Sequence, residues 1–360
     1  MIRVAASRLP RLLALLAVGA VAAGACAKPF QSAPPAKIMD VYAASPSASD
    51  AGSLLGGDWW PSAPTFAVRP LDDANFSSQV KYTVVRRYAN VGTSESWRIR
   101  YIQFDKTSSA TSLMTNAESS LGSGNTGKSV GDKALYYREK LTAGGAPYET
   151  VTLIRVGSVV VESTWLKNDG FPSSDQLGRV SSKLVSGVKD AVAGKVHGAQ
   201  PSANDLASLP PPNAYITLLG AARLPIEAIP LMLNFSAPTQ LVTLFKAENL
   251  SDFLFGDYVL DSDTHMEVQA AVFTLTSATA ASELFDAFKG SSTVDANGVL
   301  KLYNDVTGPG QYDYFVLSGS HVGLLICRST AEFSANEAAS RSCESPLETV
   351  ATAWPTAFRS

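Results

Sequence analysis

The sequence predicts an α+β fold made of two tandem similar domains, each an antiparallel sheet with helices packed on one face. Strand-like and helix-like segments follow one another in the same order in both halves of the chain. That order is strand–strand–helix–strand–strand–strand–helix, without the strict strand–helix alternation of parallel sheets. A proline-rich segment separates the halves, and only 17% of the residues are charged, which suits an exported β-rich protein.

Residues 1–25 predict a signal peptide. Arg3, Arg8 and Arg11 form a positive start, and the apolar run Leu12–Ala22 follows. This run is shorter than the roughly 20 residues that a permanent membrane helix needs. Small residues then precede a cysteine, as at a cleavage site. We therefore expect the mature protein to work outside the cytoplasm.

Two interpretations of the cleavage site remain open. In one, Ala23-Gly24-Ala25 is the site of ordinary secretion. In the other, the sequence AGAC is a lipobox and Cys26 is the lipid-modified first residue of the mature chain, although Ala23 stands where Leu is usual. The lipoprotein interpretation is favoured, because residues 26–55 are rich in Ala, Ser and Pro and suit a tether. In this interpretation, the lipid anchors the protein to the outer face of the cell membrane. In the other, the protein is secreted.

Cysteine use agrees with export. With Cys26 assigned to the lipid, Cys327 and Cys343 remain, and an even pair in an exported chain predicts a disulfide. Metal binding by this pair is less favoured, because no histidine lies near it.

The first predicted domain covers residues 56–196. Alternating hydrophobicity predicts strands, Thr107 or Ser108 is the expected cap of a helix, and Gly157-Ser158 is the expected turn of a hairpin. The segments are strands over 80–88, 97–104 and 133–141, a hairpin over 148–165, and helices over 105–121 and 173–192.

The consecutive prolines in the segment 197–213 predict a linker, and the second domain follows over 214–360. The second half repeats the order of the first, with a helix that starts at Thr276 or Ser277. Phe104 aligns with Phe273, each shortly before a Thr/Ser-rich helix start, and these short matches argue for duplication. The segments are hairpins over 255–275 and 312–328, a strand over 299–306, and helices over 276–290 and 345–354.

Residues 122–129, GSGNTGKS, match the phosphate-binding template G-x-x-x-x-G-K-[ST]. A working phosphate loop follows a strand and opens a helix. Here a predicted helix precedes the loop and a predicted strand follows it. We therefore expect a flexible connection that binds no nucleotide.

Other candidate chemistry is sparse. Ser320 and His321 are neighbours on a strand, so their side chains point to opposite faces and do not suit a nucleophile and its base. Asp261–His265, DSDTH, could hold a cation, but these residue types are also common in tight turns. The sequence predicts no catalytic, cofactor or metal residues. The net charge of −3 without a basic block argues against a nucleic-acid partner.

Trp59 and Trp60 precede a proline, and two adjacent tryptophans cannot both point into one core. One is expected to pack under the sheet while the other lies at a domain surface. The functional alternative is an aromatic contact for a ligand or partner.

The leader, the tether and hairpins such as RVGSVVV resemble cell-envelope lipoproteins of actinobacteria of uncharacterised family. The domains also resemble the extracytoplasmic sensor domain of PknH-type receptor kinases. That resemblance implies a sheet-and-helix module with a ligand cleft and disulfides. In this sequence, only Cys327 and Cys343 can form such a disulfide. It transfers no functional residue.

The expected function is that of a non-catalytic, sensor-like binding module for a small amphiphile or an envelope protein. The alternative is an exported enzyme, a hydrolase with dispersed catalytic residues.

Overall fold

The computed structural model describes residues 37–66, 78–121, 127–142, 146–211, 213–233, 235–304, 311–329 and 343–358. The predicted signal peptide and Cys26 lie outside these residues. Contacts between Cα atoms divide the chain into two compact units after Gly198, at the start of the predicted linker. We call the described parts, 37–198 and 199–358, the first and second units.

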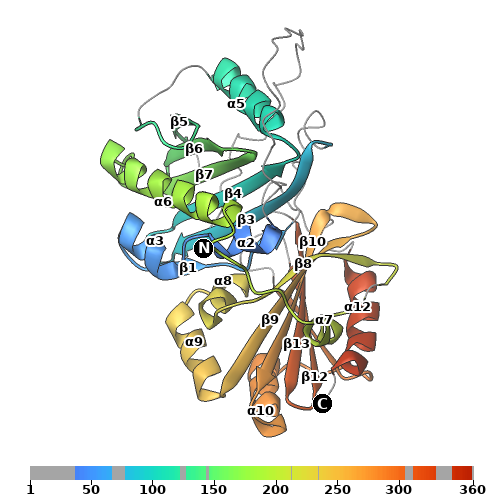
Figure 1. Cartoon of the computed structure of the whole chain (residues 1–360). Helices are drawn as coiled ribbons and strands as arrows, with labels where there is room; N and C mark the ends of the chain where they lie inside the picture. Colours follow the sequence, from blue (N-terminus) through green and yellow to red (C-terminus); the bar gives the residue numbers. More distant parts are fainter. Residues whose placement is uncertain are drawn as a thin grey trace. The chain divides into compact units, whose positions relative to one another are not determined.

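The first unit contains a seven-stranded antiparallel sheet in the order β1-β3-β4-β7-β6-β5, with β2 paired to β3. Its elements, labelled in Figure 1, are α2 (Ile38–Ala43), α3 (Ala48–Leu55), β1 (Trp59–Pro61), β2 (Thr65–Phe66), β3 (Val80–Asn90), β4 (Glu95–Phe104), α5 (Thr107–Leu121), β5 (Lys133–Lys140), β6 (Tyr148–Val156), β7 (Val159–Lys167) and α6 (Ser174–Val192).

The second unit contains a six-stranded antiparallel sheet in the order β11-β12-β13-β10-β9-β8. Two short 3-10 helices, Ile226–Ala228 and Trp354–Ala357, complete it. Its other elements are α7 (Ala203–Ser208), β8 (Ile216–Arg223), α8 (Ile229–Met232), α9 (Pro238–Ala247), β9 (Leu250–Leu260), β10 (Asp263–Leu275), α10 (Ala278–Lys289), β11 (Val299–Asn304), β12 (Gln311–Ser318), β13 (His321–Ser329) and α12 (Glu344–Ala353).

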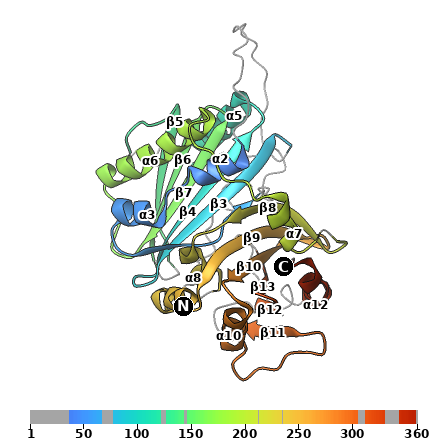
Figure 2. The ribbon, with the colours of Figure 1, turned by 60° about the horizontal axis from the view of Figure 1, so that its bottom comes forward.

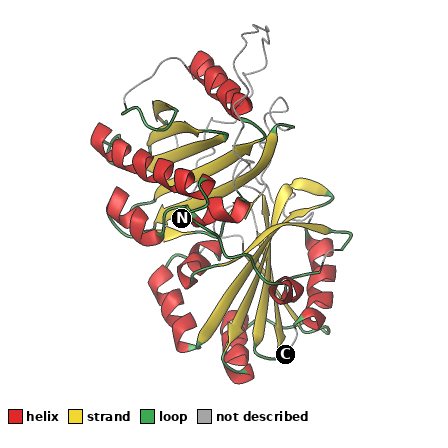
Figure 3. Cartoon of the chain, viewed as in Figure 1, coloured by secondary structure: helices red, strands yellow, loops and turns green. Residues whose placement is uncertain are grey.

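These bounds confirm the α+β class and the two similar antiparallel domains. From β3 and β9 onward, both units run strand–strand–helix–strand–strand–strand, and the strand order β3-β4-β7-β6-β5 matches β9-β10-β13-β12-β11. Figure 3 shows two sheets with helices beside each. Ser277, one of the two predicted caps, is the N-cap of α10, because its hydroxyl accepts a hydrogen bond from the Ala280 N–H. The predicted cap of α5 is wrong, because Thr107 and Ser108 are already the first two residues of that helix.

The predicted alignment of Phe104 with Phe273 is wrong by two residues. The N–H of Phe104 donates to the Ser158 carbonyl over 2.9 Å, and the N–H of Leu275 donates to the Ser320 carbonyl over 2.9 Å. Both bonds close the same corner of the sheet, so Phe104 corresponds to Leu275. The prediction aligned two phenylalanines that precede similar Thr/Ser-rich segments, whereas the hydrogen bonds of the sheet define a different register.

The helices of the first unit cover both faces of its sheet, whereas the sequence predicted helices on one. The side chain of Leu135 packs towards α5, while its neighbour Tyr136 points the other way, where its hydroxyl lies 3.4 Å from that of Ser181 in α6. The physical reason is that β7 is buried along almost its whole length, so both faces need cover. The α5 face holds a core cluster of Ile102, Phe104, Ala110, Leu113, Met114, Ala117, Leu135, Leu153 and Val160.

The second unit is covered in the same way. Phe315 stacks on Phe288 of α10 with ring centroids 4.6 Å apart, whereas its neighbour Tyr314 belongs to the core under α12. Because neighbouring side chains of a strand point to opposite faces, α10 and α12 lie on opposite sides of the sheet, as Figure 2 shows.

Two predicted connecting segments are partly folded. Within the predicted tether 26–55, α2 and α3 pack against α6, and the Tyr88 hydroxyl hydrogen-bonds to the Pro46 carbonyl. Within the predicted linker 197–213, α7 forms and Leu209 is buried. These contacts are made by isolated residues within Ala-, Ser- and Pro-rich segments. The composition of such segments does not reveal them.

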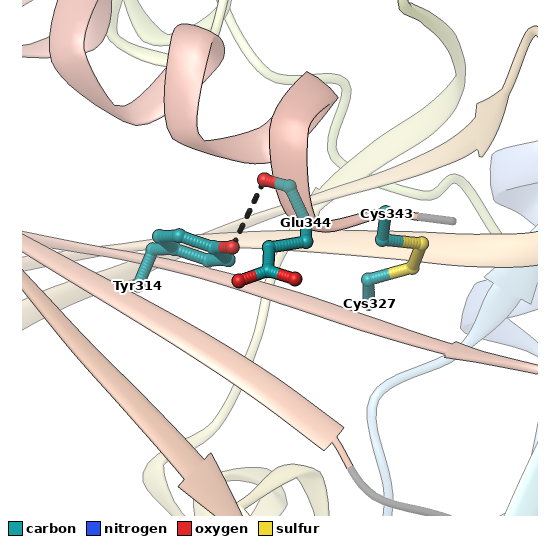
Figure 4. Close-up of a disulfide and its surroundings, with 4 residues drawn as sticks. All are labelled: Tyr314, Cys327, Cys343 and Glu344. Carbon is teal, nitrogen blue, oxygen red and sulfur yellow. Dashed lines mark hydrogen bonds between the residues drawn. A yellow bond between two sulfur atoms is a disulfide. The ribbon is translucent and has the colours of Figure 1, made fainter. Parts of the chain in front are cut away.

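The predicted disulfide is present. Cys327 in β13 and Cys343, which directly precedes α12, are bonded and buried, with their Cα atoms 6.3 Å apart. Figure 4 shows the bond beside Tyr314, whose hydroxyl donates to the Glu344 carbonyl over 3.0 Å. The bridge and this hydrogen bond hold the start of α12 on the sheet. Such a bond persists in oxidising compartments, which indicates an extracytoplasmic location.

Among the described helices, none has the length and hydrophobicity needed to cross a bilayer.

Candidate functional site

The α5 face of the first sheet carries a group of charged side chains beyond the end that α5 covers. Arg87 lies opposite Arg98, and Arg100 lies opposite Glu162. Arg98 and Arg100 are two and four residues from Ile102, which belongs to the core under α5, so all share one face. By the same alternation, Glu149 of β6 shares this face. We call Arg87, Arg98, Arg100, Glu149 and Glu162 the charged face.

Glu162 is the centre of an ion-pair network. Its Oε1 lies 2.6 Å from Nη2 of Arg98, and its Oε2 lies 4.0 Å from Nη1 of Arg100. Burial alone would raise the pKa of the Glu162 carboxyl, but the Arg100 and Arg98 guanidiniums outweigh it and hold the pKa below its ordinary value. Glu162 is therefore ionised throughout the neutral range.

Glu149 is in the opposite situation. It is only 3% exposed, and its Oε1 has no hydrogen-bond partner among the described residues. Burial, together with the nearby carboxylates of Glu139 and Glu162, raises the pKa of Glu149 to about 7, although Arg98 acts against the rise. Glu139 lies directly opposite Glu149 on β5. One face of the sheet thus holds two carboxyl groups whose pKa values are moved apart.

The two adjacent tryptophans point to opposite faces of β1, as expected. Trp59 is buried, and its Nε1 donates to the Gly56 carbonyl over 2.6 Å. Trp60 is half-buried and lies opposite Ala89 of β3, two residues from Arg87 on the same face. Trp60 is therefore an aromatic neighbour of the charged face, while Trp59 belongs to the other side. Their role as ligand contacts stays a prediction.

The octapeptide GSGNTGKS connects a helix to a strand, in the predicted order. Helix α5 ends at Leu121 and β5 begins at Lys133, and residues 122–126 lie outside the described part. The Nζ of Lys128 lies 2.9 Å from Oδ1 of Asp175, and both side chains are exposed. Lys128 thus links the loop to the start of α6.

The other candidates have structural partners. His321 stacks on Phe358 with ring centroids 5.6 Å apart, and burial lowers its pKa. In the segment 261–265, Oδ1 of Asp261 accepts a hydrogen bond from the Thr217 hydroxyl over 2.7 Å. In the described parts of the chain, no three His, Cys, Asp or Glu residues are arranged to hold a metal ion.

The charged face escaped the sequence analysis, although a signal was present. In ESWRIRYIQF, Arg98 and Arg100 alternate with apolar residues and share their parity with Ile102 and Phe104. That parity places two arginines on a face that also supplies core residues. The alternation that predicts the strand thus also indicates which of its charged side chains point inward.

Comparison with known proteins gives little. No protein-family model matches the chain, and no curated protein matches it significantly. A search of solved structures finds the extracellular domain of PknH from Mycobacterium tuberculosis, at 13% identity and a TM-score of 0.31, over 44% of this chain and 99% of that domain. Similarity this low transfers neither fold nor function.

Proposed function

We propose that the protein is a non-catalytic, sensor-like binding module of the cell envelope, anchored by a lipid on Cys26, with the charged face as its ligand site. The observation that carries this proposal is Glu149. A carboxyl group that is 3% exposed with an oxygen lacking a hydrogen-bond partner costs stability, about 1–3 kcal/mol for a typical polar group. Groups of this kind concentrate at binding sites, where a ligand supplies the missing partner.

A small amphiphile fits the surroundings of Glu149 best. Guanidinium and carboxyl groups offer hydrogen bonds to a polar head group, and Leu166, opposite Glu149, offers an apolar contact. Trp60 offers a second apolar contact beside Arg87, on β1 at the far edge of the same face. A protein partner that inserts one polar side chain is the alternative occupant within the same proposal.

Two features of the sequence and structure support this location. The N-terminal sequence has the order of a signal peptide with a cysteine at the cleavage site, and the Cys327–Cys343 bond suits an oxidising compartment.

The test is native mass spectrometry of the protein purified from membranes. We expect a lipid-modified Cys26 and a co-purified small molecule. Trp60→Ala should lower its occupancy about tenfold or more, as expected for an aromatic binding contact. Tyr215→Ala, which removes a ring that is 41% exposed in the second unit, is the matched control and should leave occupancy unchanged. An unmodified Cys26 with no bound molecule would refute the proposal.

A hydrolase is the second candidate, because a protonated Glu149 and an ionised Glu162 on one face have the complementary states of a general acid and a base. In that case Glu149→Gln would abolish turnover of activated ester or glycoside substrates by the purified protein. In a binding module, the same variant alters ligand occupancy only.

A further inference from the structure

A second group of side chains lies on the α6 face of the first sheet, at the end of β5, β6 and β7. Lys140, Tyr148 and Lys167 lie directly opposite one another on these strands. Arg138 precedes Lys140 by two residues on the same face, and Phe171 follows β7. We call Arg138, Lys140, Tyr148, Lys167 and Phe171 the basic–aromatic patch.

Contacts within the patch interleave cations and rings. The Arg138 guanidinium lies 5.5 Å from the Phe171 ring centroid, and the Lys140 ammonium lies 5.3 Å from that of Tyr148. The two rings meet edge to face at 5.1 Å. Arg138 is also held by a 2.7 Å hydrogen bond from its Nη2 to the Pro172 carbonyl. The patch is therefore a defined surface rather than a set of independent side chains.

The patch is exposed and positive. Arg138 and Lys140 are exposed, and Phe171 is 37% exposed, one of few large apolar side chains at the described surface. Asp169, whose Oδ1 lies 3.1 Å from Nζ of Lys167, offsets one positive charge. Glu139 and Glu149 belong to the opposite face by strand alternation. Two positive charges remain in excess, beside an exposed ring.

The described part of the corresponding edge strand of the second sheet, β11, pairs its cation with carboxylates. There Lys301 lies 5.3 Å from the Tyr312 ring centroid, and its Nζ contacts the carboxylates of Glu344 at 2.6 Å and Glu348 at 3.9 Å. Around Lys301 the carboxylates therefore offset the positive charge, whereas the charges on Arg138 and Lys140 have no such partner in the contacts described above.

We propose that the basic–aromatic patch binds the anionic head groups of a phospholipid bilayer. Cations close to an anionic surface gain electrostatic energy, and amphipathic rings favour the head-group region. A basic patch on the folded unit adds attraction to anionic lipids to any contribution from a lipid anchor. The inference goes beyond the proposed function, because it concerns the folded unit and holds whether or not the charged face binds a ligand.

The test is co-sedimentation of the full mature chain with vesicles, using Cys26→Ser so that no lipid anchor contributes. We expect binding to vesicles of phosphatidylcholine mixed with phosphatidylglycerol, little binding to phosphatidylcholine alone, and loss of binding at high salt. Arg138→Gln/Lys140→Gln should weaken binding roughly tenfold to thirtyfold, since each cation contributes about 1 kcal/mol near such a surface. Phe171→Ala should weaken it several-fold.

Lys189→Gln/Lys195→Gln is the matched control, because it removes the same charge from exposed positions of the same unit and should change binding less than about twofold. Unchanged melting temperatures would show that the variants fold. Equal losses in both double variants, equal binding to both kinds of vesicle, or binding to heparin but not to vesicles would each overturn the proposal.

Discussion

The two repeats place different chemistry at the same positions of one topology. In the first sheet, Arg100 of β4 lies opposite Glu162 of β7. The register that matches Phe104 with Leu275 makes Ala271 opposite Leu324 the equivalent pair in the second sheet. One repeat fills this buried position with an ion pair, and the other fills it with two apolar side chains.

This difference shows that the fold does not need an ion pair at this position. A buried ion pair loses hydration energy that its attraction only partly restores, so apolar residues are often at least as stabilising. The second sheet uses them, and the core under α10 is correspondingly rich in phenylalanine, with Phe245, Phe253, Phe273, Phe288 and Phe315 in ring contact. Asp257 and Gln269, which face each other at the positions of Arg87 and Arg98, are also buried, so the comparison favours binding over folding only for the Arg100–Glu162 pair.

The strongest test of this comparison converts the first sheet into the second. Glu162→Leu alone removes the carboxylate that both Arg98 and Arg100 contact, and we expect it to lower the free energy of unfolding by about 3–5 kcal/mol. Arg100→Ala/Glu162→Leu recreates the pair of the second sheet and should recover the part of that loss that comes from Arg100, while Arg98 still lacks its carboxylate partner. Urea unfolding of the full mature chain measures both. If the double variant is as unstable as the single one, the ion pair is a folding requirement and the comparison fails.

The disulfide gives a smaller effect, confined to the second unit. Cys327→Ser/Cys343→Ser opens a cross-link between residues 16 apart, which constrains the unfolded chain by about 3 kcal/mol. We expect calorimetry to show a lower melting temperature for the second unit and an unchanged one for the first, which has no cysteine in its described part. The parent protein treated with a reductant should behave like the variant. A shift of both transitions would mean that the two units do not unfold independently.

The sequence predicted the regular part of the fold well, because its signals are local. Alternation located the hairpins, and turn residues such as Gly157 and Gly319 marked where they reverse. These glycines have φ values of 59° and 56°, in the left-handed region that favours glycine. Segments of weak periodicity were missed, including β1, β8 and α9. These elements are stabilised by contacts with neighbouring strands of the sheet, which lie elsewhere in the sequence.

The site was harder to predict, because it depends on long-range neighbours. Glu149 and Glu162 come from different strands, and burial raises the pKa of both. Arg100 and Arg98 outweigh burial at Glu162, whereas Glu139 adds to it at Glu149, so the two pKa values move in opposite directions. Nothing near either glutamate in the sequence distinguishes them. Of the two adjacent tryptophans that were predicted as possible ligand contacts, Trp60 lies beside the charged face and Trp59 does not.

Glu149 offers the finest comparison, since the second unit has Gln311 at the equivalent strand position. The raised pKa of about 7 means that folding keeps a proton on Glu149 that the unfolded chain releases at lower pH. Stability therefore falls as the pH rises from the ordinary carboxyl range to about 7, and the lost part is not regained above that pH. The full shift corresponds to about 3 kcal/mol, and partial hydration of the charged form reduces our expectation to about 2 kcal/mol.

Glu149→Gln removes this titration and gives the first sheet the residue of the second. Compared by urea unfolding, the variant should be more stable than the parent by about 2 kcal/mol near pH 8 and about equally stable near pH 4. The carbon-13 shift of the Glu149 carboxyl reports the same pKa directly. The facing charges on Glu139, Glu162 and Arg98 stay in place in both proteins, so the difference isolates Glu149. A parent and variant with parallel pH profiles would mean that the carboxyl ionises without cost, and the argument for a missing ligand partner would lose its basis.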